Sequence, residues 1–107
     1  MTLKTWFLVA TLGVLAGSAA QAQEEGDPRI GERLASTCMG CHAVEGARNA
    51  YPSYRVPKLG GQSEEYLISA LKAYRSGERS HGTMQAQAGG LSDEEIRHIA
   101  AYFAEQR

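Results

Sequence analysis

The five residues Cys38-Met39-Gly40-Cys41-His42, CMGCH, contain both cysteines of this 107-residue chain and one of its three histidines. Such a stretch can form a short disulfide, half of a zinc site, a thiol redox motif or a covalent anchor for a prosthetic group. These four interpretations predict different proteins, so the sequence on either side must discriminate between them.

Three of the interpretations fit the surrounding sequence poorly. A Cys38–Cys41 disulfide closes a very small loop and adds little entropic stabilisation. A structural zinc ion needs four protein ligands, and His81 and His98 lack the usual spacing of a second ligand pair. A thioredoxin-like C-x-x-C follows a strand in an α/β pattern, whereas a helical pattern precedes Cys38.

The fourth interpretation accounts for every part of the motif, because C-x-x-C-H is the signature of c-type haem attachment. The thiols of Cys38 and Cys41 can add to the two vinyl groups of one porphyrin. His42 is then held against the iron as an axial ligand. The sequence therefore predicts one covalently bound haem c.

The N-terminus predicts export from the cytoplasm. Lys4 precedes an apolar run from Trp6 to about Ala16, and small residues follow up to Ala22. This is the layout of a secretory signal peptide, and the run is shorter than the roughly 20 residues that span a bilayer. We expect cleavage after Ala22, no stable membrane insertion, and a periplasmic domain of residues 23–107.

Length and charge restrict the remaining possibilities. A chain of 107 residues holds one small domain. Its formal net charge of −1 lacks the basic excess of a nucleic-acid-binding protein.

Hydrophobic periodicity predicts an all-α domain of about three main helices joined by long loops. The first helix begins at Asp27-Pro28, since Asp is a good N-cap and Pro suits the first helical position. Its apolar residues Ile30, Leu34 and Cys38 lie four apart and lead directly into CMGCH.

Two further helices have clear start signals. Ser63 is the expected N-cap of a helix that ends at Gly77, and Ser92 with Glu95 forms a capping box for the last one. Their apolar faces are Leu67, Ala70, Leu71 and Tyr74 in the second helix and Ile96, Ile99, Ala100 and Phe103 in the last. Residues 43–62 and 78–91 are expected to be irregular. Three short helices make a thin core, which a bulky apolar group would complete.

The second axial position has two candidates, Met84 and His81, in the irregular segment 78–91. Met39 is excluded because it lies on the same side of the ring as His42. His98 is expected to point outward from the last helix into solvent. We favour Met84 over His81, because Met with His is a standard ligand pair in electron-transfer haem proteins.

Together these features resemble class I cytochrome c of the short bacterial type, and the chain is similar to one half of the dihaem bacterial cytochromes. The resemblance covers essentially all of residues 23–107. It rests on CMGCH, on Pro57-Lys58-Leu59-Gly60-Gly61-Gln62, and on Met84 followed by the last helix in the expected order.

The resemblance implies a helical fold wrapped around one haem, whose iron is ligated by His42 and Met84. It implies that the Pro57 carbonyl accepts a hydrogen bond from the far nitrogen of His42. It also places Gln62 and Tyr66 in the wall of the haem pocket.

In the same family, Gly31 would allow the first helix to pack closely against the last, near Tyr102 and Phe103. A side chain at Gly31 would hold the two helices apart.

The predicted function is that of a soluble periplasmic single-electron carrier rather than an enzyme. Its donor would be a quinol–cytochrome c oxidoreductase or a dehydrogenase, and its acceptor a terminal oxidase or reductase. One alternative is a cytochrome subunit of a multi-subunit periplasmic redox enzyme. A sensor or enzyme with an open iron would require that Met84 does not ligate.

Basic residues lie in the loops that would surround the haem. These are Arg48, Arg55 and Lys58 in the first loop and Arg75 and Arg79 before Met84. A mildly basic rim of this kind would steer acidic partners.

Overall fold

The computed structural model describes residues 24–43, 46–50 and 53–106, so the predicted signal peptide, residues 1–22, lies outside the described residues. The described part is all-α, as predicted, and contains no strand. Its helices are α1 Pro28–Leu34, α2 Ser36–His42, α3 Glu64–Ser76, α4 Gly82–Ala88 and α5 Asp93–Glu105. None of them is long and apolar enough to cross a membrane.

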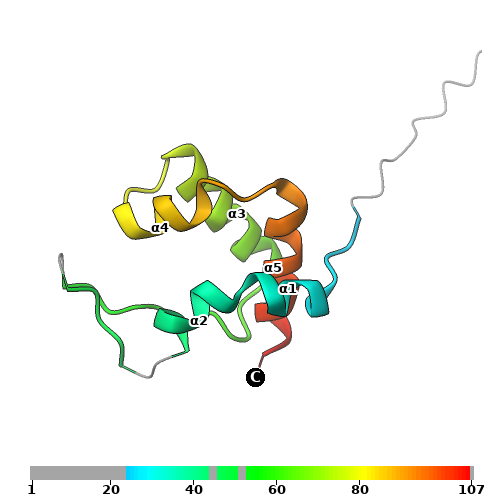
Figure 1. Cartoon of the computed structure of the whole chain (residues 1–107), viewed down its shortest axis with the longest axis horizontal. Coiled ribbons are helices and arrows are strands. Elements are labelled where there is room, and N and C mark those ends of the chain that lie inside the picture. The colour runs from blue at the N-terminus through cyan, green and yellow to red at the C-terminus, as the bar shows by residue number, and fades with distance from the viewer. Residues whose placement is uncertain (1–23, 44–45, 51–52, 107) are drawn as a thin grey trace, which may run out of the picture.

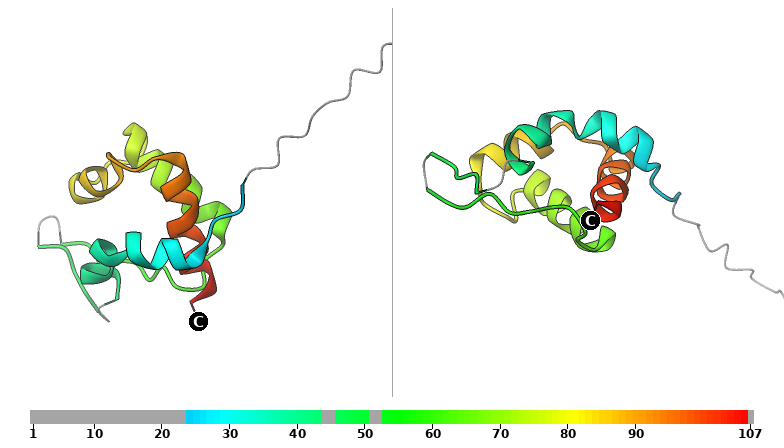
Figure 2. Two further views of the ribbon diagram at one scale, coloured as in Figure 1. Left: turned by 45° about the vertical axis from the view of Figure 1, so that its right-hand side comes forward. Right: turned by 90° about the horizontal axis from the view of Figure 1, so that it is seen from below.

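The helices form an open ring rather than a closed bundle. Figure 2 shows α4 at one end of the ring and α2, with the loop that follows it, at the other. α5 lies in the middle, where α1 crosses it on one side and α3 packs along it on another (Figure 1).

The expected first helix is two helices, which corrects the prediction of one continuous stripe. The break is at Ala35, which is fully buried. Its carbonyl accepts hydrogen bonds from the backbone N–H groups of both Cys38 and Met39, so the chain tightens into a three-residue turn there. This bend redirects α2, and with it CMGCH, away from the axis of α1.

A second correction concerns residues 78–91, which were expected to be irregular but contain α4. Its sequence, GTMQAQA, has no apolar stripe and therefore no helical periodicity to detect. Ala, Gln and Met are nevertheless good helix formers, and the His81 side chain caps the helix by accepting the backbone N–H of Met84. Met84 therefore lies on a helix and not in a loop.

The expected caps of α3 and α5 are confirmed. Ser63 accepts the backbone N–H of Tyr66, and Gly77 ends α3 in the left-handed conformation. Ser92 and Glu95 form both hydrogen bonds of the capping box. The buried core consists of Ala35, Leu67, Ala88, Ile96, Ile99, Ala100, Ala101 and Phe103. Most of these residues belong to α5, which makes it the central element of the fold.

Gly31 sets the distance between α1 and α5. A Cβ atom at this position would lie 1.9 Å from the carbonyl oxygen of His98 and 2.8 Å from Cβ of Tyr102. Both contacts are far inside van der Waals range, so only glycine fits. The close packing near Tyr102 is thus confirmed, whereas Phe103 is not among the nearest neighbours.

His98 corrects another expectation, because its side chain points inward and is only 12% exposed. Its Nδ1 atom accepts the backbone N–H of Asp27 at 2.8 Å. The sequence could not reveal this contact, because the segment that covers this face of α5 comes from the other end of the domain. Asp27 in turn caps α1 through the N–H of Arg29.

Replacing Gly31 by Ala should destabilise the holoprotein by about 1–3 kcal/mol or more, the usual cost of overpacking. Gly40→Ala is the matched control, since a Cβ atom at this helical glycine meets nothing within 4 Å. It should be neutral or stabilise by roughly 0.5–1 kcal/mol. Urea unfolding monitored by circular dichroism measures both changes. Equal stabilities of the two variants would contradict the close contact between α1 and α5.

The ion pairs of Asp93, at the start of α5, predict that the fold loses stability in acid. Asp93 accepts a hydrogen bond from Arg75 at 2.6 Å and lies 3.4 Å from Lys72, and these two contacts lower the pKa of its carboxyl group. Because its pKa is lowered, ionised Asp93 stabilises the fold at pH values above the ordinary Asp pKa of about 4. This stabilisation is lost as the pH falls through the folded-state pKa. In Asp93→Asn, unfolding free energy should therefore depend less on pH below about 4. An unchanged slope would contradict this role.

Candidate functional site

A single cavity of about 400 Å³ collects every site residue that the sequence predicted. Side chains of all five helices line it, together with those of Asn49, Tyr54, Arg55, Val56, Pro57, Leu59 and Gln62. Its wall includes Cys38, Cys41, His42, Pro57, Gln62, Tyr66 and Met84. The segments that carry these residues are up to 46 positions apart (84 − 38 = 46), so the fold alone brings them together.

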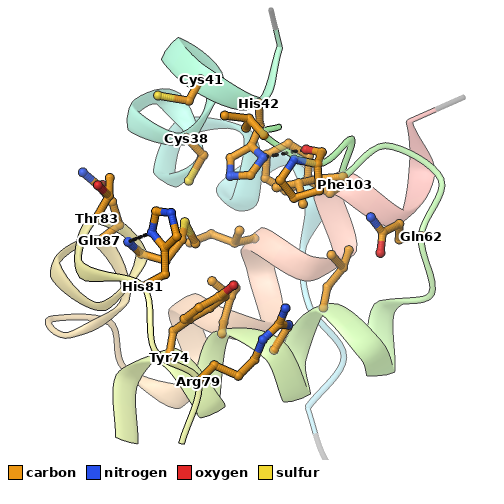
Figure 3. A pocket seen from close by; sticks show the side chains of 18 of the residues that line it. Cys38, Cys41, His42, Gln62, Tyr74, Arg79, His81, Thr83, Gln87 and Phe103 are labelled. Atoms are coloured by element: carbon orange, nitrogen blue, oxygen red, sulfur yellow. Dashed lines mark hydrogen bonds between the residues drawn. The ribbon is translucent and has the colours of Figure 1, made fainter. Parts of the chain in front are cut away.

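The two thiols lie on the α2 side of the cavity (Figure 3). Both cysteines are free, Cys38 half-buried and Cys41 exposed. Burial raises the pKa of the Cys38 thiol, which makes it a poor thiolate ligand or redox nucleophile. The part of the chain that the structure describes contains no group of three or more His, Cys, Asp or Glu side chains that could hold a metal ion.

His42, at the end of α2, is held in a defined orientation. Its Nδ1 atom lies 2.8 Å from the carbonyl oxygen of Pro57 (Figure 3). A carbonyl can only accept, so Nδ1 carries the proton and donates it. The Nε2 atom of the neutral ring is then left with a free lone pair, which is the state a metal ligand needs.

α4 provides the facing side of the cavity and carries Met84. The backbone N–H of Met84 donates to Nδ1 of His81 at 3.4 Å, so in the neutral ring the other nitrogen, Nε2, carries the proton. Such a ring has no free lone pair for a metal unless the cap of α4 is broken. Met84 is half-buried, and its thioether takes no part in capping α4.

The cavity has a polar wall, in which the turn after α3 adds Arg79 to the expected residues Gln62 and Tyr66. The Arg79 guanidinium lies 4.6 Å from the centre of the Tyr74 ring and donates to the hydroxyl of Tyr66 at 3.4 Å. The Gln62 amide donates to the carbonyl of Lys58. Arg79 was expected only as one of several rim charges, because its contact with Tyr66 spans 13 positions.

Among the residues that the structure describes, the charges along the wall are of one sign. Arg55 and Arg79 line the cavity, and no described Asp or Glu does. Arg75, in contrast, does not line it and is engaged by Asp93 and by the carbonyl of Leu91. Of the five basic residues predicted to form a rim, Arg55 and Arg79 thus line the cavity, whereas Arg48, Lys58 and Arg75 do not.

This donor set fits a c-type haem. Two free thiols lie next to an imidazole with an available nitrogen, and a thioether faces them from α4. Most of the wall is apolar, through residues such as Leu34, Leu67, Leu71, Leu91 and Phe103, as a porphyrin ring requires. The guanidinium of Arg79 and the hydroxyl of Tyr66 can interact with the edge of a porphyrin that carries its carboxylates.

The comparisons with known proteins point to one family. Residues 29–106 match the family model of cytochrome c. The chain is 48% identical to cytochrome c-554(548) of Halomonas halodenitrificans, over 76% of this chain and 98% of that protein. It is 34% identical to cytochrome c4 of Pseudomonas aeruginosa, covering 94% of this chain but only 48% of that one.

A solved structure shows the same arrangement of helices. Thiosulfate dehydrogenase from Marichromatium purpuratum superimposes with a TM-score of 0.63 at 33% identity, over 84% of this chain and 21% of that chain. The chain thus spans nearly all of one relative and about half or less of the others compared.

Proposed function

Because this chain belongs to the cytochrome c family, and so is an electron-transfer protein with one covalently bound haem c, we propose that it is a soluble periplasmic single-electron carrier with His and Met as axial ligands. The observation that carries this proposal is the cavity itself, where the thiols and imidazole of α2 face the thioether of α4. The haem, when bound, supplies an iron that gains or loses one electron.

Each residue of the site has a separate task in holding the haem. Cys38 and Cys41 would form the two thioether bonds and hold the porphyrin against α2. His42 would ligate the iron through Nε2. The Pro57 carbonyl accepts its Nδ1–H, an arrangement that fixes the orientation of the imidazole and raises ligand basicity. This hydrogen bond at 2.8 Å supports the assignment of His42.

Met84 is the proposed sixth ligand. His81 supports this choice by using its acceptor nitrogen to cap α4, which orders the helix that presents the thioether. With both axial positions filled by protein atoms, the site has no open coordination position for a substrate. Met ligation also raises the reduction potential relative to two His ligands.

Electrons should enter and leave near Cys41. This cysteine is exposed, whereas the apolar side of the cavity is closed by buried Leu67, Ile99 and Phe103. Tyr66 and Gln62 lie in the wall of the cavity as expected, and Tyr66 anchors Arg79. The Arg79 guanidinium, held by Tyr66, can neutralise the charge of a haem carboxylate, so no additional cation is needed there.

The proposed signal peptide would determine where the protein acts and therefore which partners it can meet. Export after cleavage at Ala22 would deliver residues 23–107 to the periplasm. There a donor such as a quinol–cytochrome c oxidoreductase or a dehydrogenase, and a terminal oxidase or reductase as acceptor, would exchange electrons with it.

A second candidate function is that of the cytochrome subunit of a periplasmic redox enzyme. The likeness to thiosulfate dehydrogenase favours it, because there a domain of this kind forms part of a larger chain. Purification of the native protein separates the two functions. A stoichiometric complex would favour the subunit, and a free cytochrome the carrier.

The spectrum of a Met84→Ala variant tests the axial ligand. The oxidised wild-type protein should show the weak far-red band of Met–iron coordination, and the variant should lose it. The reduction potential should fall by on the order of 0.1 V or more, within the roughly 0.8 V range that axial ligands cover. The reduced variant should also bind carbon monoxide.

His81→Ala is the matched control, since it removes the other candidate ligand and leaves Met84 in place. It should keep the far-red band and destabilise α4 by about 0.5–2 kcal/mol, the usual cost of losing an N-cap. Absence of the band in the wild type, with carbon monoxide binding gained in His81→Ala but not in Met84→Ala, would overturn the assignment.

Covalent attachment is tested with Cys41→Ser and the double variant Cys38→Ser/Cys41→Ser. Acidic acetone should extract no haem from the wild type, because the thioether bonds survive, and should extract all of it from the double variant. The single variant should keep its haem through Cys38 but shift the absorption maximum, since one vinyl group remains. Haem extraction from the wild type would exclude a c-type attachment.

A further inference from the structure

The two helices that carry the proposed axial ligands belong to different arms of the open ring (Figure 2). α2, which ends at His42, packs against α1, whereas α4, which carries Met84, packs against α3. The cavity lies between the two arms, so these packing contacts do not by themselves fix the position of one ligand relative to the other. A contact that joins the arms would add that constraint.

α4 has little packing of its own. It has seven residues, all of which the structure describes, and only Ala88 among them is buried. A helix shorter than about 12 residues is marginally stable by itself, and segments with few buried contacts open locally at a low free-energy cost. The position of Met84 therefore depends on what secures the start of α4.

His81 secures that start through two contacts. Its Nδ1 atom accepts the backbone N–H of Met84 at 3.4 Å and so caps α4 at the cavity (Figure 3). Its ring centre lies 6.3 Å from that of Tyr54, with the two rings inclined by 43°, within the range of about 4.5–7 Å for interacting aromatic pairs. Tyr54 lines the cavity and is 61% exposed. Because Tyr54 comes from the segment that follows α2, the pair joins the two arms of the ring.

Tyr54 is held in place by its own backbone. Its carbonyl accepts the N–H of Asn49 at 2.8 Å. Three residues later, the Pro57 carbonyl accepts the Nδ1–H of His42 at 2.8 Å. The four residues from Tyr54 to Pro57 thus contact both supports of the proposed ligands, the His42 imidazole directly and Met84 through His81.

We propose that Tyr54 is a positioning residue for the sixth ligand, whose ring holds His81 at the start of α4 and thereby keeps the Met84 thioether at the iron. The proposal rests on the proposed function, since it requires that Met84 ligates. Without the Tyr54 ring, His81 loses one of its two contacts. The cap of α4 then opens more often, and the thioether leaves the iron more often.

Imidazole binding to the oxidised holoprotein measures how often Met84 leaves the iron, because imidazole can bind only after the thioether has left. Stopped-flow absorption records the binding rate over a range of imidazole concentrations. At saturating imidazole this rate equals the rate of Met84 departure, which easier entry of imidazole into the cavity would not change. Hydrogen exchange of the Met84 backbone amide reports opening of the cap in the same samples.

Three single or double changes are compared with one matched control. Tyr54→Ala removes the ring, and Tyr54→Phe is the control that keeps it. His81→Asn removes the other ring of the pair but retains a side chain that caps helices well. The double variant Tyr54→Ala/His81→Asn completes a double-mutant cycle, which isolates the contribution of the pair.

We expect Tyr54→Ala to bind imidazole roughly two- to twelvefold more tightly, which is the contribution of an aromatic pair, about 0.5–1.5 kcal/mol, converted at about 1.4 kcal/mol per factor of ten. Its Met84 amide should exchange faster, and Met84 should leave faster at saturating imidazole. Tyr54→Phe should behave as wild type. His81→Asn should match Tyr54→Ala, and the double variant should show little further change. The far-red band should persist in every variant without imidazole, because Met84 remains bound most of the time.

Unchanged imidazole affinity and departure rate in Tyr54→Ala, with the far-red band present in wild type, would overturn this proposal and leave the axial assignment intact. The same increase in Tyr54→Phe would also overturn it, since the ring would then have no effect. So would additive effects in the double variant, because the two side chains would then act separately. A wild type without the far-red band, whose imidazole binding rate reaches no limit, would overturn the axial assignment and this proposal with it.

Discussion

The contact between α1 and α5 at Gly31 determines where the site can form. The backbone of α1 approaches the His98 carbonyl so closely that only glycine fits, and the His98 ring holds the N–H of Asp27 at the start of the same helix. From this fixed start the chain bends once, at Ala35, before it enters α2. The position of the thiols and of His42 is therefore set by packing at Gly31, ten residues upstream of Cys41 (41 − 31 = 10).

Half of the eight buried core residues also line the wall of the cavity. Leu67, Ile99, Ala100 and Phe103 belong to the central cluster and also line the cavity. On their other side these residues face α1 and the rest of α5. A small domain with so few buried residues gains a large part of its apolar burial from the haem. Folding and cofactor retention should accordingly be coupled, with binding free energy adding to stability.

Much of the fold and the chemistry of the site could be predicted from local sequence, because their signals are local. CMGCH, the Ser63 cap, Gly77 and the capping box at Ser92 each act within a few positions. The family resemblance added the Pro57 hydrogen bond to His42, which no local pattern encodes. The sequence failed where a helix has no apolar stripe, as in α4, or where distant segments meet, as for His98 with Asp27.

Arg79 illustrates the same limit at the site. In sequence it is one of several arginines before Met84, and nothing distinguishes it from Arg75. In space the turn after α3 returns Arg79 to Tyr66 and Tyr74 in the cavity wall, while Arg75 pairs with Asp93 at the start of α5. Arg79 thus lies in the wall of the cavity, whereas Arg75 ties α3 to α5.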